Sequence, residues 1–290
     1  MNIVNSIPPR NVLVTGATGF IGKCLVSRLE QTGITAYPFA VSMGQDVRDS
    51  EAFEPFKTKN ISHVFHLAGR TFVPDSWEEP GQFYQVNTLG TQHVLDFCRA
   101  VNARLVYVSA YIYGIPQFLP ISESHPVCPN NPYAHSKWLG EELCRFYSQH
   151  FGVPVTVLRP FNIYGPGQDQ QFLIPSILRQ ARSKAAITVK DSTPRRDYLH
   201  IEDFVQSCIK SLQSNSQFSI FNVGSGCSIS VKELLEMVKK HSPHTLEWKS
   251  TGEIRINEIP DTVADISAIQ AALHWSPQLT LEDFVRSELS

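Results

Sequence analysis

The stretch from Asn11 to Gly33 limits most strongly how this chain can fold. It begins with NVLVTG, a short apolar and β-branched run that ends at a glycine, which is typical of a buried strand. In the FIGKCLVSRLEQTG that follows, Ile21, Leu25 and Leu29 recur at helical spacing. Gly33 then supplies a stop signal for the helix. A strand, a glycine-rich turn and a helix are therefore expected in succession.

The same alternation of strands and helices continues to about residue 165. Apolar runs predict further strands at 34–41, 63–69, 104–110 and 153–165, and helical spacing predicts helices at 83–102 and 133–152. Apolar strands separated by helices indicate a parallel sheet covered on both faces. We predict an α/β fold, with a doubly wound parallel sheet of the Rossmann type at 1–165 and a smaller C-terminal α/β substrate-binding region at 166–290. Some elements of the second region are expected to return to the main sheet.

Composition and charge exclude several classes of protein. The 290 residues are enough to bury a large core, and 25 basic against 27 acidic side chains, without a basic run, argue against nucleic acid as a partner. The six cysteines show neither CxxC spacing nor nearby His pairs, so neither a metal site nor a disulfide framework is expected. No run of about 18 apolar residues occurs, and the amino terminus does not resemble a signal peptide. We expect a soluble, cytoplasmic protein without a membrane partner.

Three glycines stand between the first strand and the first helix, in TGATGFIG. Without side chains, the turn can close, a pyrophosphate can approach the backbone N–H groups at the helix start, and helix and strand can pack closely. Three glycines can also serve a tight turn alone, but the position between strand and helix favours dinucleotide binding. The predicted cofactor-binding residues of this turn are Gly16, Thr18, Gly19, Phe20, Ile21 and Gly22.

The second strand does not reveal which dinucleotide binds. About 20 residues after the glycine turn, AYPFAVSM contains neither an acid for the ribose hydroxyl of NAD nor an Arg for the phosphate of NADP. The choice between NAD and NADP therefore stays open. In the next segment, QDVRD, Asp46 can accept a hydrogen bond from the adenine amino group while Val47 packs on the ring. A helix-capping role is the alternative, and it suits Asp49 better than Asp46.

YAHSK places a tyrosine four residues before a lysine. Such a pair arises readily by chance, and a surface packing or cation–π contact is the alternative interpretation. Here Asn131 can cap the helix and Pro132 can take its first position, so Tyr133 and Lys137 share one face near its start. An ammonium beside a phenol is expected to lower the pKa of the phenol, so that tyrosine can exchange a proton near neutrality.

A hydroxyl is predicted at the same edge of the sheet. Ser109 ends the fourth strand in VYVSAYIYG, and ligands of open α/β sheets bind at the carboxyl ends of the strands. A serine at a strand end is otherwise usually a turn residue. Beside Tyr133, its hydroxyl can bind the same substrate oxygen that tyrosine protonates.

An ordered series of motifs covers nearly the whole chain: TGATGFIG, DV, HLAG, Asn87, SAYIYG, YAHSK, LRPFNIYGPG, RRDYLHIEDF, FNVGSG and IPDTVADIS. This series resembles the extended short-chain dehydrogenase/reductases of the NAD-dependent epimerase/dehydratase family, which modify nucleotide sugars. The resemblance implies NAD or NADP as cofactor, a nucleotide-diphosphate sugar as substrate and a homodimer. The active-site Ser or Thr of the family lies five residues before the glycine of its YG ending, which is Ser109 counted back from Gly114.

The resemblance also implies a role for each matching residue. Tyr133 would be the acid/base, Lys137 its electrostatic partner and an anchor for the cofactor ribose, and Ser109 a ligand of the substrate oxygen. Further implied cofactor contacts are Leu67, Ala68, Gly69, Asn87 and, beside the nicotinamide, Phe161.

Three residues match positions at which the family contacts the nucleotide diphosphate: Asn162, Arg196 and, in EIRINEIPD, Arg255. The planar guanidinium of arginine suits phosphate oxygens. Alternatively, Asn162 is a turn residue and Arg196 is half of a surface ion pair with Asp197, which would contribute little stability. The RDY and H-x-x-D matches around Arg196 favour the functional interpretation.

The family shares hydride transfer between nicotinamide and a sugar carbon, usually C4, with proton transfer through tyrosine. A 4,6-dehydratase needs an acid and a carboxylate directly after Ser109, where this chain has Ala110 and Tyr111, so dehydration is disfavoured. Reduction of a 4-keto (6-deoxy) nucleotide sugar and 4-epimerisation, as in UDP-glucose 4-epimerase, stay open. The short chain and the missing acid in the second strand favour the reductase.

A regulator that binds dinucleotide without turnover is the alternative from another class. Relatives of that kind characteristically lose the tyrosine or the lysine, whereas this chain keeps Ser109, Tyr133 and Lys137, so an enzyme is expected. For the homodimer, GTQHVLDFCRA and KWLGEELCRFY are the candidate interface helices, which alternatively only pack on the sheet.

Overall fold

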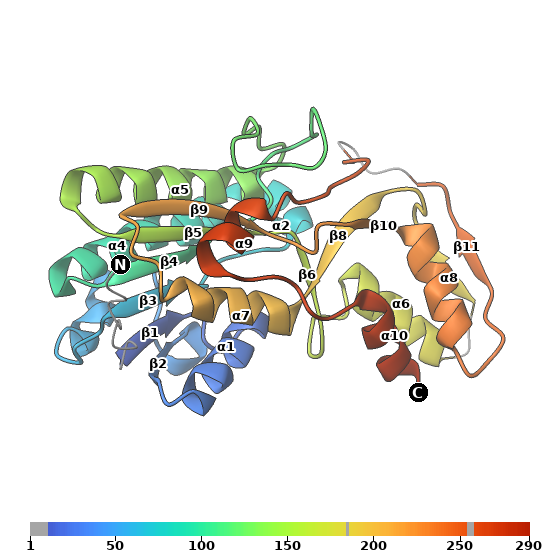
Figure 1. Cartoon of the computed structure of the whole chain (residues 1–290), viewed down its shortest axis with the longest axis horizontal. Helices are drawn as coiled ribbons and strands as arrows, with labels where there is room; N and C mark the ends of the chain where they lie inside the picture. The colour runs from blue at the N-terminus through green and yellow to red at the C-terminus, as the bar shows by residue number, and fades with distance from the viewer. Residues whose placement is uncertain (1–10, 184–185, 254–257) are drawn as a thin grey trace.

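The computed structural model describes residues 11–183, 186–253 and 258–290. A six-stranded parallel sheet with the order β2-β1-β3-β4-β5-β9 forms its centre (Figure 1). Its strands are β1 (Asn11–Thr15), β2 (Thr35–Phe39), β3 (His63–His66), β4 (Arg104–Val108), β5 (Val155–Pro160) and β9 (Phe218–Val223). The central strands are apolar along nearly their whole length because both faces of the sheet are covered.

Helices cover both faces, so the doubly wound Rossmann-type sheet predicted from the sequence is confirmed (Figure 1). One core cluster joins the sheet to α1 (Phe20–Gln31), α7 (Ile201–Ser211) and α9 (Ser267–Leu273). A second cluster on the opposite face joins it to α4 (Gly90–Val101) and α5 (Pro132–Phe151). In this chain α4 and α5 therefore pack on the sheet and on each other, and a homodimer through them stays a prediction.

The segment expected as one helix at 83–102 is divided. It consists of α3 (Pro80–Tyr84), a π-helical turn η3 (Gln85–Leu89) and α4. The shorter helical elements nearby are η1 (Val41–Met43), η2 (Ser50–Phe56) and α2 (Val73–Glu78). The π-helical turn contains Asn87, whose side chain forms hydrogen bonds to Arg70 and Ser136.

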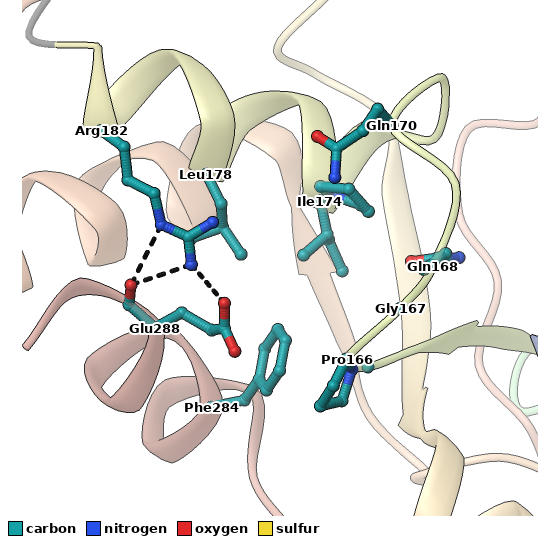
Figure 2. A pocket seen from close by; sticks show the side chains of 11 residues that line it. Pro166, Gly167, Gln168, Gln170, Ile174, Leu178, Arg182, Phe284 and Glu288 are labelled. Carbon is teal, nitrogen blue, oxygen red and sulfur yellow. Dashed lines mark hydrogen bonds and ion pairs between the residues drawn. The ribbon is translucent and has the colours of Figure 1, made fainter. Parts of the chain in front are cut away.

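A smaller group of elements forms one end of the molecule (Figure 1). It contains a three-stranded sheet, β10 (Ser228–Ser230), β8 (Arg195–His200) and β6 (Asn162–Tyr164), and a two-stranded sheet, β11 (Trp248–Ser250) and β7 (Ile187–Val189). The helices α6 (Leu173–Arg182), α8 (Val231–His241) and α10 (Leu281–Leu289) pack around a separate core there. A small hollow of about 50 Å³ lies between α6 and α10. Figure 2 shows the side chains that line it, including the ion pair of Arg182 and Glu288.

The boundary between the two groups differs in one respect from the expectation. The strand expected at 153–165 is two strands, with β5 in the main sheet and β6 in the three-stranded sheet. In return, β9 pairs with β5 in the main sheet, although it lies in the second half of the chain. The division of the chain into domains at residue 165 stays a prediction. No helix of the described ranges is both long and apolar enough to cross a membrane.

The strand register brings the predicted site residues to one edge of the main sheet. Thr15 at the end of β1 pairs with Phe39 of β2 and with His66 of β3, and His66 pairs with Tyr107 of β4. The carboxyl ends of these four strands therefore lie side by side. The glycine turn, the segments after β2 and β3, and Ser109 after β4 therefore meet at the carboxyl edge, where β1 and β3 diverge in their connections.

Candidate active site

A cleft of about 440 Å³ opens at this carboxyl edge. The segments that follow β1, β2 and β3 line the cleft, together with Gln82 of α3 and Val86 of η3. Eight of the predicted cofactor-binding residues are on its wall: Gly16, Thr18, Gly19, Asp46, Val47, Leu67, Ala68 and Gly69. The sequence analysis did not identify the remaining wall residues, which include Ser42, Arg48, Arg70 and Gln82.

The glycine turn is packed so closely that side chains would not fit. Gly16 has a φ of +72°, and a Cβ there would lie 2.7 Å from the backbone N of Ala68. A Cβ at Gly22 would lie 2.1 Å from the carbonyl oxygen of Gly16. The N-cap residue of α1, Gly19, offers no side-chain cap, and the first turn of α1 contains no acid. Its N–H groups are therefore available to an anion, so the turn fits a dinucleotide pyrophosphate.

The remaining two residues of this motif, Phe20 and Ile21, begin α1 and pack against the core cluster beneath it. Their contact with a cofactor stays a prediction.

The wall near the end of β2 carries an ion pair. The guanidinium of Arg48 contacts both carboxylate oxygens of Asp46, at 2.6 to 3.1 Å. These hydrogen bonds from Arg48 lower the pKa of Asp46, so its carboxylate stays ionised. Asp49, and not Asp46, caps the next helical turn by accepting from the N–H of Glu51 at 2.9 Å, as expected. Asp46 lies on the cleft wall with both carboxylate oxygens bound by Arg48, and its predicted contact with adenine stays a prediction.

Asn87 lies directly behind the Gly69–Arg70 turn, which lines the cleft. Its side chain is fully buried, lies outside the wall of the cleft, and binds the backbone N–H and C=O of Arg70 at 2.9 and 3.0 Å. It also donates to the hydroxyl of Ser136 at 2.9 Å. Because these bonds occupy both ends of the amide, Asn87 holds the Gly69–Arg70 turn against the start of α5. Its predicted contact with the cofactor stays a prediction.

Tyr133 and Lys137 occupy the first two turns of α5. The predicted cap is confirmed, because Asn131 accepts from the N–H of Ala134 at 2.8 Å and Pro132 is the first helical residue. The Lys137 ammonium is buried, lies 4.6 Å from the centroid of the Tyr107 ring, and is 3.8 Å from where a Cβ of Gly69 would be. It therefore lies behind the wall of the cleft. Burial lowers the pKa of Lys137 to about 8.

The expected low pKa of Tyr133 is wrong for this structure. Burial raises the pKa of the phenol, and the charge of Lys137 is not among the causes of its shift. The ammonium instead lies over the ring of Tyr107. The sequence spacing predicted the shared helix face but not the degree of burial, which determines the sign of the shift.

Ser109 follows β4 directly, and its backbone N–H donates to the carbonyl of Leu158 at 2.8 Å. Its neighbour Ala110 packs in one small apolar cluster with Tyr133 and Ala134, so the end of β4 and the first turn of α5 lie together. The hydroxyl of Ser109 is buried and has no hydrogen-bond partner among the described residues. A buried hydroxyl without a partner at this place is suited to a substrate oxygen.

Two of the three predicted substrate contacts lie in the three-stranded sheet. Asn162 of β6 donates to the backbone carbonyl of Asp197 at 3.0 Å. The guanidinium of Arg196 in β8 forms an ion pair with Glu258 and donates to the carbonyl of Ile259 at 2.6 Å. Both guanidinium and carboxylate are mostly buried. The third residue, Arg255, lies outside the described residues.

The alternative interpretation of Arg196 as a surface partner of Asp197 is wrong. Asp197 is fully buried, and its carboxylate accepts from the backbone N–H groups of Ser225, Gly226 and Ala264 at 2.6 to 3.0 Å. It thereby ties β8 to the loop after β9 and to the C-terminal segment. The two residues alternate on the strand, and they point to opposite faces of the sheet.

The H-x-x-D match after β8 is structural. His200 caps α7 by accepting from the N–H of Glu202, and Asp203 accepts from the N–H groups of Gln278 and Leu279. These contacts fix the C-terminal segment that leads to α10. The match therefore does not by itself support a functional role for Arg196.

The sequence from residue 12 to residue 224 matches the NAD dependent epimerase/dehydratase family. The chain belongs to this family. Among curated relatives, the GDP-6-deoxy-D-mannose reductase of Pseudomonas aeruginosa is 30% identical, with 97% of this chain and 96% of that protein covered. The UDP-glucose 4-epimerase of Lactobacillus helveticus is 29% identical, with 92% of each chain covered.

Solved structures of family members show the same fold. The structure of RMD from Pseudomonas aeruginosa complexed with NADPH has a TM-score of 0.88 and 30% identity, covering 97% of this chain and 96% of that one. A UDP-glucose 4-epimerase of Thermus thermophilus in complex with NAD has a TM-score of 0.86 and 27% identity, covering 96% and 97%. This member of the epimerase/dehydratase family is therefore an NAD(P)-dependent enzyme of the extended short-chain dehydrogenase/reductase type.

A buried ion pair in this family member was not found from the sequence. Arg159 at the end of β5 donates to both oxygens of Glu141, which lies one helical turn after Lys137 in α5. Arg159 also donates to the hydroxyl of Tyr113 at 2.8 Å, and Tyr113 donates to Asn222 of β9 at 2.6 Å. The network joins the helix with Tyr133 to the strands beside it. The only sequence signal was Arg159, a lone charge in the largely apolar strand β5.

Proposed function

We propose that this enzyme reduces the 4-keto group of a nucleotide-activated (6-deoxy) sugar with NAD(P)H. The observation that carries the proposal is the cleft wall after β2, which consists of Ala40, Val41 and Ser42 and offers no acid to a ribose hydroxyl. Among the described wall residues, Asp46 is the acid, and Arg48 neutralises it. Because this wall does not hold the ribose through an acid, it favours a cofactor that is exchanged in each catalytic cycle. A cofactor that stays tightly bound is disfavoured.

The catalytic residues have complementary tasks. When bound, the nicotinamide supplies the hydride. The phenol of Tyr133 stays protonated because burial raises its pKa, so it donates its proton to the sugar oxygen as the ketone becomes an alcohol. Lys137, a buried cation behind the wall of the cleft, would anchor the ribose of the cofactor. The unpartnered hydroxyl of Ser109 binds the same sugar oxygen and orients it.

The residues after Ser109 support reduction over dehydration. Ala110 has no ionisable group, and the hydroxyl of Tyr111 donates to the carbonyl of Gly114 at 2.7 Å. Burial raises the pKa of Tyr111, so the phenol does not ionise near neutral pH. Neither residue supplies the carboxylate that elimination of water across C5 and C6 requires.

Epimerisation at C4 is the second candidate. It is favoured by the relatives of Lactobacillus helveticus and Thermus thermophilus, which are UDP-glucose 4-epimerases of similar length. An epimerase returns the hydride to the same sugar and therefore gains from a tightly held NAD. The missing acid after β2 disfavours this mode of cofactor binding.

Two measurements on the purified protein separate the candidates. The first is the amount of nicotinamide cofactor released on denaturation. The second is the oxidation of added NADPH or NADH with GDP- and dTDP-linked 4-keto-6-deoxy sugars, compared with interconversion of UDP-glucose and UDP-galactose. We expect little retained cofactor and cofactor oxidation with one 4-keto sugar. Stoichiometric NAD together with UDP-hexose interconversion would make the enzyme an epimerase.

A further inference from the structure

A second buried hydroxyl, besides that of Ser109, lacks a partner near the predicted substrate contacts. Tyr198 of β8 is 9% exposed, and its hydroxyl has no hydrogen-bond partner among the described residues. Protein interiors rarely leave such a group unpaired, because the hydroxyl loses its bonds to water on folding. This hydroxyl can therefore take a partner from outside the chain, and its neighbours decide whether a ligand is expected there.

The strand pairing places Tyr198 among the predicted substrate contacts. Asn162 of β6 pairs directly with Tyr198 in the parallel ladder, so both side chains leave the same face of the sheet. Arg196 lies two residues before Tyr198 on β8 and therefore shares that face. Three polar side chains thus point from one face, and Tyr198 is the one that the sequence analysis did not identify.

The electrostatic surroundings of Tyr198 indicate the kind of ligand. The charge of Arg196 reaches its hydroxyl and lowers its pKa, while Glu258 and above all burial raise it to about 12. The phenol therefore stays protonated near neutral pH and acts as a donor. Arg196 already holds one anionic oxygen, that of Glu258. A guanidinium and a phenol that leave one face of β8 two residues apart are suited to a phosphate group.

We propose that the Tyr198 hydroxyl donates a hydrogen bond to the diphosphate of the nucleotide-sugar substrate, beside Arg196. This inference rests on the proposed function, because that function supplies the diphosphate. Tyr198 is a binding residue in this role and takes no part in the chemical step. Its loss therefore weakens substrate binding and leaves the binding of NADPH unchanged.

The chain offers a matched control in Tyr164. This tyrosine lies on β6 and shares the face of Asn162, and its buried hydroxyl also has no partner in the described part of the chain. Both tyrosines pack in the core cluster of the small region, but burial and the acids Asp203 and Asp283 raise the pKa of Tyr164. Its ring lies 5.2 Å from Phe284, which lines the hollow of Figure 2. No cation is among the groups that shift its pKa, so a phosphate is not expected there.

The test compares Tyr198→Phe, Tyr164→Phe and the parent enzyme in calorimetric titrations with GDP, UDP and dTDP, and in thermal unfolding without nucleotide. Each variant loses an unpaired buried hydroxyl, so both should unfold at the same temperature as the parent or higher. Only Tyr198→Phe should raise the Kd of the preferred nucleotide, by roughly tenfold or more, as expected for a lost hydrogen bond to a charged group. NADPH should bind equally to all three proteins.

Three results would overturn the inference. Equal nucleotide affinity of Tyr198→Phe and the parent would mean that the hydroxyl does not face the ligand. Equal weakening in Tyr164→Phe would assign the effect to packing of the small region. A parent enzyme that binds none of the three nucleotides would overturn the proposed substrate class as well, and this result distinguishes the failure of the function from the failure of Tyr198 alone.

Discussion

The cofactor cleft and the substrate side of the site are built in different ways. The cleft owes its shape to backbone: a glycine turn, the ends of parallel strands and the N–H groups of α1. The proposed substrate side consists of side chains that either bind one another, as Arg196 binds Glu258, or have no partner among the residues that the structure describes, as with Ser109 and Tyr198. A site made of backbone is formed once the chain folds, whereas a site made of side chains exchanges its internal partners for the ligand. The first half should therefore be sensitive to added volume and the second to the loss of single polar atoms.

The largest effect is expected where the two halves meet, at Tyr133. Tyr133→Phe should lower kcat by about 100- to 10,000-fold, the range for a lost general acid, because the proton donor is removed. The Kd of NADPH should stay within about twofold, since the ring and its edge contact with Phe83 remain. Initial rates and fluorescence titration measure the two quantities. Tyr37→Phe, on the edge strand β2, is the control. Full activity in Tyr133→Phe would defeat the assignment of Tyr133 and with it the enzyme proposed here.

The next largest effect is expected on stability, at the buried Glu141–Arg159 ion pair that connects α5 to β5. Glu141→Gln leaves Arg159 as a buried charge without its counter-ion, and both side chains are almost inaccessible, with 1% and 3% exposed. Breaking such a pair typically costs about 3 to 5 kcal/mol of unfolding free energy. Urea unfolding measures the loss. Glu54→Gln, which breaks an exposed pair with Lys57, should cost less than about 1 kcal/mol. Similar losses in the two variants would mean that water reaches the buried pair.

A third substitution tests the backbone-built half directly. Gly22→Ala adds a Cβ only 2.1 Å from the carbonyl oxygen of Gly16, so α1 must shift away from the turn. Overpacking of this kind costs roughly 1 to 3 kcal/mol, and the displaced N–H groups should weaken NADPH binding. Gly81→Ala is the control, because nothing lies within 4 Å of its added Cβ. If Gly22→Ala bound NADPH like the parent, the helix N-terminus would not be the pyrophosphate site.

The same contrast explains which features could be predicted from the sequence. Strands β1 to β5 and helices α1 and α5 follow from apolar runs, helical spacing and caps, which are local signals. The return of β9 to the main sheet and the buried carboxylates of Asp197 and Asp203 depend on partners far along the chain, such as Ala264 and Gln278. No local pattern announces such contacts. For the same reason the glycine turn was predicted correctly, whereas the pKa of Tyr133, which depends on tertiary burial, was not.

The smallest effect is the pH dependence that Lys137 gives to both rate and stability. Its pKa falls from an ordinary 10.5 to about 8 because it is buried, so the cation proposed to anchor the cofactor ribose is lost as pH rises through about 8. The rate should fall to about half there and continue downward, and initial rates between pH 6 and 10 measure this limb. His66 should add no limb near pH 6.5, because burial lowers its pKa to about 3.

Stability should move in the opposite direction over the same range. Between about pH 8 and 10.5 the unfolded chain keeps the Lys137 proton that the folded enzyme has released, so the unfolded state binds more protons and this group stabilises the fold increasingly as pH rises. Below about pH 8 both states carry the proton, and the penalty for burying the cation is complete. Lys137→Met removes this contribution, so the difference in unfolding free energy between the two proteins should shrink with pH in that window. The contrary result would be a rate that stays constant to pH 10 and a difference in unfolding free energy between parent and Lys137→Met that does not change with pH. It would show that Lys137 keeps its proton and that its surroundings are more polar than their packing implies.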